Sequence, residues 1–127
     1  MRKYKMLAAA LFMLILPFFI HNARAEDMTG RSGGIQATLK VDPKKSMIDL
    51  YLYDYAKALT PITEAKVEVR IRTPRGAVKK DLAGMKMGGE YSFMNSLDLS
   101  AKGRYIFDIT VETGGRKANF SFSYDNK

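Results

Sequence analysis

Strict alternation of apolar and polar side chains is the feature that most limits what this chain can fold into. It is clearest in residues 65–73, where Ala65, Val67, Val69 and Ile71 alternate with charged or hydroxylic residues. A period of two matches a β-strand, whose successive side chains point to opposite faces, and no helix face would hold it. The segment is therefore predicted to be a strand with one buried and one wet face.

Six other short segments separated by turn signals are also predicted to be strands, most of them with the same alternation. These segments are residues 35–42, 47–53, 78–82, 91–94, 105–112 and 118–124. Gly114–Gly115 predicts a tight hairpin turn, because glycine adopts the positive φ angles that such turns need. Residues 54–64 and the Gly-rich residues 83–90 are expected to be loops, and residues 26–34 a flexible leader. The fold predicted is all-β, a seven-stranded antiparallel immunoglobulin-like β-sandwich.

The strand that begins near Tyr105 is expected to be the one against which the others pack. A turn at residues 101–103 precedes it, and in immunoglobulin-like sandwiches a tyrosine at such a corner ties down the preceding turn through its hydroxyl group. The predicted core consists of Leu39, Val41, Leu50, Leu52, Val67, Val69, Ile71, Phe93, Leu97, Tyr105, Phe107, Ile109, Phe120 and Phe122.

The first 25 residues have the three parts of a secretory signal peptide. A basic start is followed by 15 uncharged residues, 6–20, and then by small residues at Ala23 and Ala25. The apolar run is short for a membrane-spanning helix and contains Pro17. We therefore expect an exported protein, periplasmic or extracellular, cleaved near Ala25. The alternative is an uncleaved membrane anchor. Residues 35–127 would form the folded domain.

The chemistry of the exported part is narrow. Removing the first 25 residues leaves 17 basic and 13 acidic residues, a net charge of +4, and takes away His21, the one histidine. The remainder has no His, Cys or Trp, so it offers no Ser-His-Asp triad, no thiol nucleophile and no ordinary zinc site. We expect a protein that is not an enzyme and has no nucleic-acid partner.

Several motifs occur in a familiar order. They are Asp54, the run from Pro61 to Val67, Gly84-Met85-Lys86-Met87, Gly89-Glu90-Tyr91, Leu99, Gly103-Arg104-Tyr105 and Phe120-Ser121-Phe122. Over about residues 36–124 this order resembles the YtkA-like and FixH-like group of extracytoplasmic immunoglobulin-like domains. The resemblance implies an accessory role, since FixH-like members are linked to copper supply and oxidase assembly and YtkA-like domains to heavy-metal efflux components. The related CopC-type copper site uses an N-terminal His, which this chain lacks after residue 25.

Met85, Met87 and Met94 are the candidate metal ligands. Their thioethers favour copper(I) over harder ions, and copper(I) is the one cofactor that the sequence suggests. The alternative is that Met94 fills core space while Met85 and Met87 pack a loop against the domain.

Tyr51, Tyr53 and Tyr55 form a candidate partner-binding row on the outer face of their strand. Exposed tyrosines offer a large contact area with a polar tip, which suits an unidentified protein partner in the envelope. The alternative is packing against neighbouring long side chains or under residues 56–63.

A basic group around one predicted hairpin is a candidate contact for anionic polymers or lipid head groups. It consists of Arg70, Arg72, Arg75, Lys79 and Lys80. The alternative is an ordinary solvated edge. Membrane contact would otherwise occur only through an uncleaved N-terminal segment. Two function classes thus compete: a metal-linked accessory protein, and a protein-interaction or structural module without metal.

Overall fold

The computed structural model describes residues 26–127. The predicted signal peptide and its cleavage site therefore lie outside the described residues. Within residues 26–127, no helix is long and apolar enough to cross a membrane.

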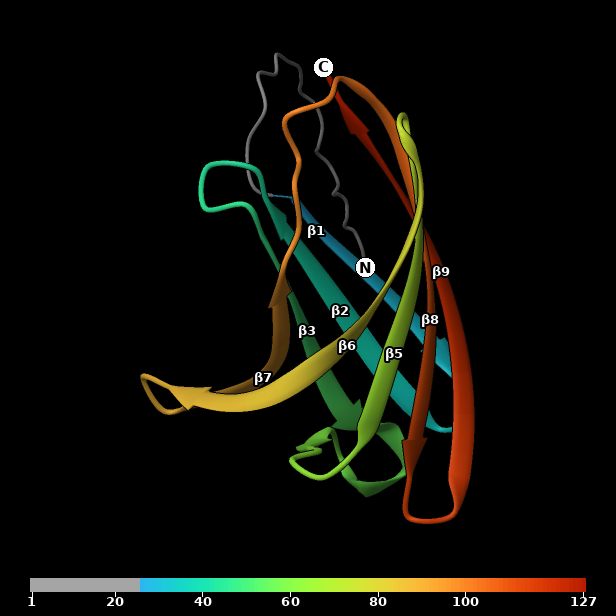
Figure 1. The fold of residues 1–127 in the computed structure, drawn as a ribbon. Coiled ribbons are helices and arrows are strands. Elements are labelled where there is room, and N and C mark those ends of the chain that lie inside the picture. The colour runs from blue at the N-terminus through green and yellow to red at the C-terminus, as the bar shows by residue number, and fades with distance from the viewer. Residues whose placement is uncertain (1–25) are drawn as a thin grey trace, which may run out of the picture.

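The described chain is antiparallel β-structure almost throughout (Figure 1). The strands are β1 (Glu26–Ser32), β2 (Ile35–Asp42), β3 (Met47–Asp54), β4 (Thr60–Pro61), β5 (Lys66–Thr73), β6 (Gly76–Met87), β7 (Glu90–Ser96), β8 (Gly103–Thr113) and β9 (Arg116–Asn126), with one 3₁₀ turn, η1 (Tyr55–Lys57). Their order across the sheet is β1-β2-β3-β7-β6-β5-β8-β9, and β4 pairs with β3 outside this path. The all-β antiparallel prediction is confirmed.

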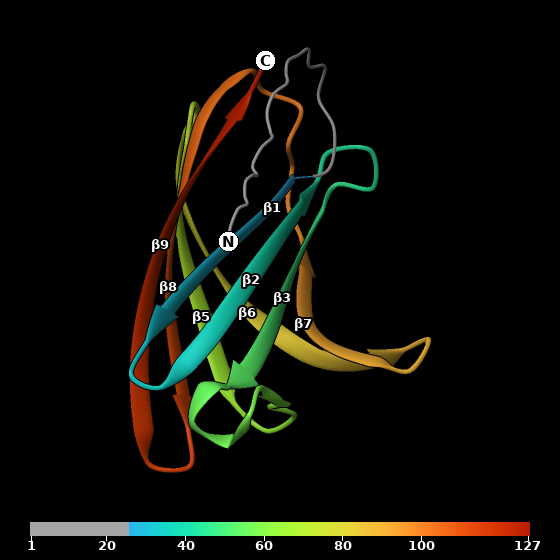
Figure 2. The ribbon, with the colours of Figure 1, turned by 180° about the vertical axis from the view of Figure 1, so that it is seen from behind.

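Strand β6 belongs to both halves of the structure. Its residues 76–82 pair with β5, and its residues 83–87 pair with β7. This crossing bends one continuous sheet into a nearly closed shape whose open seam lies between β1 and β9 (Figures 1 and 2). The hairpin of residues 83–92, here called the β6–β7 arm, extends away from the body.

The core lies between the two halves of the sheet and follows the alternation in the sequence. In β2 and β3 every second residue is buried, so Leu50 and Leu52 point inward while Tyr51 and Tyr53 point outward. All predicted core residues are buried except Phe122, which is partly buried. The core also contains residues that the prediction omitted, namely Ile35, Ala37, Ile48, Leu82, Leu99, Val111, Ala118 and Tyr124.

The corner before β8 is held as the sequence predicts. The Tyr105 hydroxyl donates a 2.7 Å hydrogen bond to the carbonyl oxygen of Ala101, and the Tyr105 side chain is fully buried. The Asn126 amide donates to Leu99 at 2.7 Å and to Ala101 at 2.9 Å. These bonds satisfy the buried carbonyl groups of the loop between β7 and β8 and fix its position.

Two predictions about strand content are wrong. Residues 26–34 are not a flexible leader, because residues 26–32 form β1, which pairs along its whole length with β2. The apolar pattern of residues 26–32 is weak because β1 is an edge strand. In addition, Gly30 leaves room for the Phe122 ring, since a Cβ atom at residue 30 would lie 3.3 Å from that ring. With the two-residue β4, the strand count is nine and not seven.

The predicted Gly-rich loop of residues 83–90 is also wrong. Residues 83–87 continue β6, and the turn occupies only Gly88 and Gly89. The alternation is disguised because Gly84 stands on the inner side, where the Tyr91 ring packs on it. A Cβ atom at residue 84 would come within 2.9 Å of ring carbons of Tyr91. The predicted loop of residues 54–64 contains η1 and β4.

One ion pair joins the ends of β3 and β9. Asp54 is 8% exposed, and its carboxylate accepts a 3.0 Å hydrogen bond from the Arg116 guanidinium. The same carboxylate also accepts from the Ala56 amide at 3.1 Å and so caps η1. Because Arg116 follows the β8–β9 turn, this pair links strands from opposite halves of the sheet at one end of the molecule.

We predict that Arg116→Met lowers the free energy of unfolding by about 2 kcal/mol, because it leaves the buried Asp54 carboxylate without its cationic partner. Chemical denaturation with urea measures the change. Arg104→Met is the matched control, because Arg104 pairs at 3.3 Å with an exposed partner, Asp125, and should cost less than about 0.5 kcal/mol. Equal losses in the two variants would contradict the role given to Asp54.

Candidate functional site: a tyrosine–methionine face

The strand register brings two groups of predicted site residues onto one outer face. Asp49 in β3 pairs with Met94 in β7, so Tyr51 and Tyr53 share a side of the sheet with Met94. Directly paired residues of antiparallel strands point to the same face. The β6–β7 register then continues this face, and its defining members are Tyr51, Tyr53, Met85, Met87 and Met94, here called the tyrosine–methionine face.

The three methionines of the face differ in exposure. Met85 is 46% exposed and Met87 is 60% exposed, whereas Met94 is half-buried. Met85 pairs with Ser92 and Met94 pairs with Ala83, so Met85 and Met94 stand diagonally across two strands. Long side chains reach each other at that spacing. The arm therefore presents two free thioethers, with a third beside its base.

The three tyrosines are not equivalent. Tyr51 and Tyr53 are half-buried on the outer side of β3, with the Lys40 ammonium 5.8 Å from the centre of the Tyr51 ring. Tyr55 lies beyond the strand in η1, is 49% exposed, and has the Arg31 guanidinium 4.1 Å above its ring. The predicted row of three is thus a pair on the face and a third tyrosine at its end.

A carboxylate with an unmet hydrogen bond lies at the centre of the face. Asp49 Oδ1 is buried and has no hydrogen-bond partner in the described part of the chain. Burial raises the pKa of Asp49, and the nearby Lys40 partly opposes this. Burial also raises the pKa of Tyr51, and the charges of Asp49 and Glu90 add to the effect. The face therefore carries an electrostatic cost that Lys40 relieves only in part.

The possible metal ligands on this face are thioethers. Within residues 26–127 there is no group of three or more His, Cys, Asp or Glu side chains placed to hold a metal ion. Met85 and Met87 of β6 and Met94 of β7 lie on one face of these two paired strands, with Asp49 next to Met94. Such a set suits a soft monovalent ion and not zinc or copper(II).

Most of the predicted basic group is paired with acidic neighbours. Its ion pairs are Lys79–Glu68 at 2.8 Å, Arg72–Asp108 at 3.2 Å and Arg75–Asp98 at 3.6 Å. Arg70 pairs in the ladder with Lys79 on one side and Asp108 on the other. Interleaved charges of both signs weaken any field for an anionic polymer.

Lys80 is separate from this group. It pairs with the buried Val69, which places it on the inner side of β6, in phase with Val78 and Leu82. Lys80 is half-buried, whereas Lys79 is exposed. The predicted basic group is therefore divided, with Arg70, Arg72 and Lys79 on the outer side of the sheet, Lys80 on the inner side and Arg75 in the β5–β6 turn.

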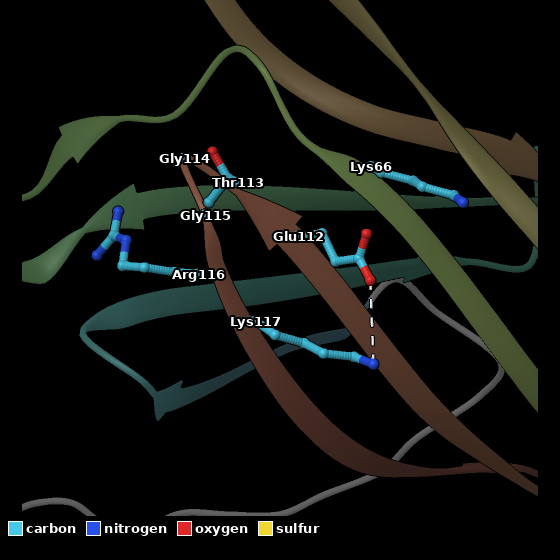
Figure 3. Close-up of a pocket in the computed structure, with 7 residues that line it drawn as sticks. All are labelled: Lys66, Glu112, Thr113, Gly114, Gly115, Arg116 and Lys117. Carbon is cyan, nitrogen blue, oxygen red and sulfur yellow. Dashed lines mark ion pairs between the residues drawn. The ribbon is translucent and has the colours of Figure 1, made fainter.

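A shallow hollow of about 420 Å³ lies beside the β8–β9 turn (Figure 3). Its lining includes Lys66, Glu112, Arg116 and Lys117. Figure 3 shows that the three basic side chains point in different directions, with Lys117 directed at Glu112, 3.9 Å away. Arg116 is occupied by Asp54. The hollow therefore has no converging cations for an anion.

Sequence reasoning missed three members of the site region: Asp49, Glu90 and Ser92. Asp49 alternates with Tyr51 and was readable as an outer residue, but its burial depends on neighbouring strands. Ser92 is 4% exposed opposite Met85, and Glu90 pairs with Met87 at the tip of the arm. The places of Ser92 and Glu90 opposite Met85 and Met87 depend on β6 continuing to residue 87, and the glycines in this segment concealed that continuation.

Comparisons with known proteins show the fold. No protein-family model and no curated protein sequence matches this chain. FetP from uropathogenic E. coli strain F11, expressed in the periplasm of E. coli, superposes with a TM-score of 0.62 over 82% of this chain and 94% of its own, at 8% identity. A DUF4426 family protein from Pseudomonas aeruginosa PAO1 superposes with a TM-score of 0.59 over 77% and 94%, at 17% identity. Membership of the YtkA-like group is not confirmed and stays a prediction.

We predict that Asp49→Asn stabilises the protein at pH 7 and leaves its stability unchanged near pH 3. Because the folded state raises the pKa of Asp49 from its ordinary value of 3.8, the native carboxyl binds its proton more tightly than the unfolded one. Stability therefore falls as pH rises through the folded-state pKa, and the amide removes that loss.

Thermal unfolding of both proteins across this pH range measures the effect. Asp27→Asn, on the exposed edge strand β1, is the control. A destabilised Asp49→Asn variant at pH 7 would show that the carboxylate has a partner.

Proposed function

We propose that this chain is an exported, non-catalytic binding protein of the bacterial envelope, and that a protein partner docks on the tyrosine–methionine face. One observation carries the proposal: the β3–β7–β6 register places two tyrosines and three methionines on a single outer face. The face continues onto the arm, which extends from the body and is open to approach.

The composition of the face suits protein recognition. Tyrosine supplies contact area with little conformational freedom to lose, and methionine adapts to irregular surfaces. Lys40 and Glu90 lie near Tyr51 and supply one charge of each sign. Apolar anchors ringed by charges are the usual arrangement of a binding hot spot.

The location and the absence of catalysis belong to the same proposal. The N-terminal pattern is that of a signal peptide, and FetP, which shares the fold, was produced in the periplasm. The exported part has no His or Cys for acid–base or nucleophilic chemistry. An immunoglobulin-like accessory domain of the YtkA-like kind fits these features.

We predict that a photo-crosslinking residue placed at position 85 traps one discrete partner in the source cells, while one placed at position 70 traps none. Both positions are exposed, but residue 70 lies on the outer side of β5, away from the face. Adding Tyr51→Ser should remove the crosslink at position 85 with a change in melting temperature of only a few degrees. Equal crosslinking from positions 85 and 70 would exclude the face as the contact surface.

The second candidate function is copper(I) binding by Met85, Met87 and Met94. The β6–β7 strand register favours it, because it places the thioethers of Met85 and Met87 in β6 and of Met94 in β7 on one face of the sheet. Copper handling in the envelope would then be the accessory role.

We predict for this alternative that the Met85→Leu, Met87→Leu double variant loses at least about tenfold in copper(I) affinity. Titration against a chromogenic copper(I) chelator measures it, and leucine preserves the apolar volume. Met28→Leu is the control, because Met28 lies in β1 and packs against the core. Unchanged affinity in the double variant would eliminate this site.

A further inference from the structure

A small cavity lies between the start of β6 and the loop that joins β7 to β8. Its volume is about 220 Å³. One wall is the β5–β6 turn with Val78 and Lys80 of β6, and the other is formed by Leu97, Asp98, Ala101 and Tyr105. Val78 is 40% exposed and supplies accessible apolar surface to the cavity, whereas Leu97 and Tyr105 are core residues that are almost fully buried.

The walls of the cavity are held in place by bonds described above. Ala101 accepts hydrogen bonds from Tyr105 and Asn126, which fix the loop. The Arg75 guanidinium reaches Asp98 at 3.6 Å and so joins the two walls. Asp98 is kept ionised because Ser100 hydrogen bonds and Arg75 lower its pKa. The hydrogen bonds to Ala101 therefore fix the wall formed by the β7–β8 loop, and the exposed Arg75–Asp98 pair adds little to this.

Lys80 is the unusual member of the lining. Its register places it on the inner side of β6 beside Val69, where the neighbouring positions of the same face hold Val78 and Leu82. Lys80 forms no ion pair with any residue in the range 26–127, whereas Lys79 is paired with Glu68. A half-buried ammonium beside an apolar side chain such as Val78 gains from an anionic partner.

We propose that this cavity binds a small monocarboxylate with a short apolar chain, with Lys80 contacting the carboxylate and Val78 contacting the chain. Asp98 is already engaged by Arg75 and Ser100, so Lys80 is the unengaged charge in the lining. The volume is below that of drug-sized pockets, which restricts the ligand to a few heavy atoms. This site is independent of the tyrosine–methionine face.

The competing explanation is that Lys80 only protects an edge. Residues 76–82 of β6 pair with β5 on one side, and a charge turned inward discourages pairing on the other. Edge protection predicts no preference for an anionic ligand.

The test is a titration of the full chain with hexanoate, hexanol and hexylamine, followed by amide chemical shifts in nuclear magnetic resonance. Hexanoate should bind at least about tenfold more tightly than hexanol, with the largest shifts at residues 78–80 and 97–101, and hexylamine should not bind there. Lys80→Met should abolish the preference for hexanoate, while Lys79→Met, an outward neighbour on the same strand, should keep it.

Three outcomes would overturn the proposal. They are equal binding of hexanoate and hexanol, loss of hexanoate binding in the Lys79 variant to the same degree as in the Lys80 variant, and shifts confined to other parts of the chain. Lys80→Gln serves as a second variant if the methionine substitution lowers the melting temperature, and retained hexanoate preference in a folded Lys80→Gln protein would equally refute it.

Discussion

The backbone hydrogen bonds of β6 are the interaction on which the rest of the structure depends. One half of this strand pairs with β5 and the other half with β7, so a single segment joins the two sides of the core. If β6 ended at residue 82, the sheet would separate into two layers joined only by loops and side chains. The crossing also creates the two surfaces of functional interest, because it projects the arm and leaves the inner side of residues 78–80 beside a cavity.

The tyrosine–methionine face shows a conflict between folding and surface chemistry. A protein under selection for stability alone would not keep an unsatisfied carboxylate oxygen at Asp49 or large exposed side chains at Met85 and Met87. Costs of this kind are commonly retained at sites that contact something else. Arg72 of β5 and Lys79 of β6 show the opposite pattern, since Asp108 and Glu68 pair with them within the fold.

Much of the fold was predictable because alternation reports directly which face of a strand is buried. Most of the inward residues of β2, β3, β5 and β8 were identified in this way, as was the corner at Tyr105, although Ile35, Ala37, Ile48 and Val111 were omitted from the predicted core. Prediction failed where side chains carry little hydropathy information. Strand β1 is an edge strand with few apolar residues, and residues 83–87 alternate between Gly or Lys and Ala or Met, a pattern that reads as a loop.

The site was less predictable than the fold because it depends on register between strands far apart in sequence. The tyrosines and methionines were each recognisable as unusual, but nothing local to either group indicates that Asp49 pairs with Met94. Lys80 is a different case. Its position two residues from both Val78 and Leu82 places it on their face of the strand and was readable from the sequence. The prediction grouped Lys80 with Lys79 by charge, although adjacent residues of a strand point to opposite faces.

The open seam has a consequence for how the molecule moves. Within residues 26–127, β1 pairs only with β2 and β9 only with β8. A 3.4 Å hydrogen bond from the Asn119 amide to the Ser32 hydroxyl joins β1 to β9, assisted by packing of Phe122 on Gly30. Such side-chain contacts can break while the backbone hydrogen bonds of the β1–β2 and β8–β9 pairs stay intact. Local opening should therefore occur mainly along the seam between β1 and β9. We expect amide hydrogen exchange to be fastest in β1 and slowest in β5 and β8.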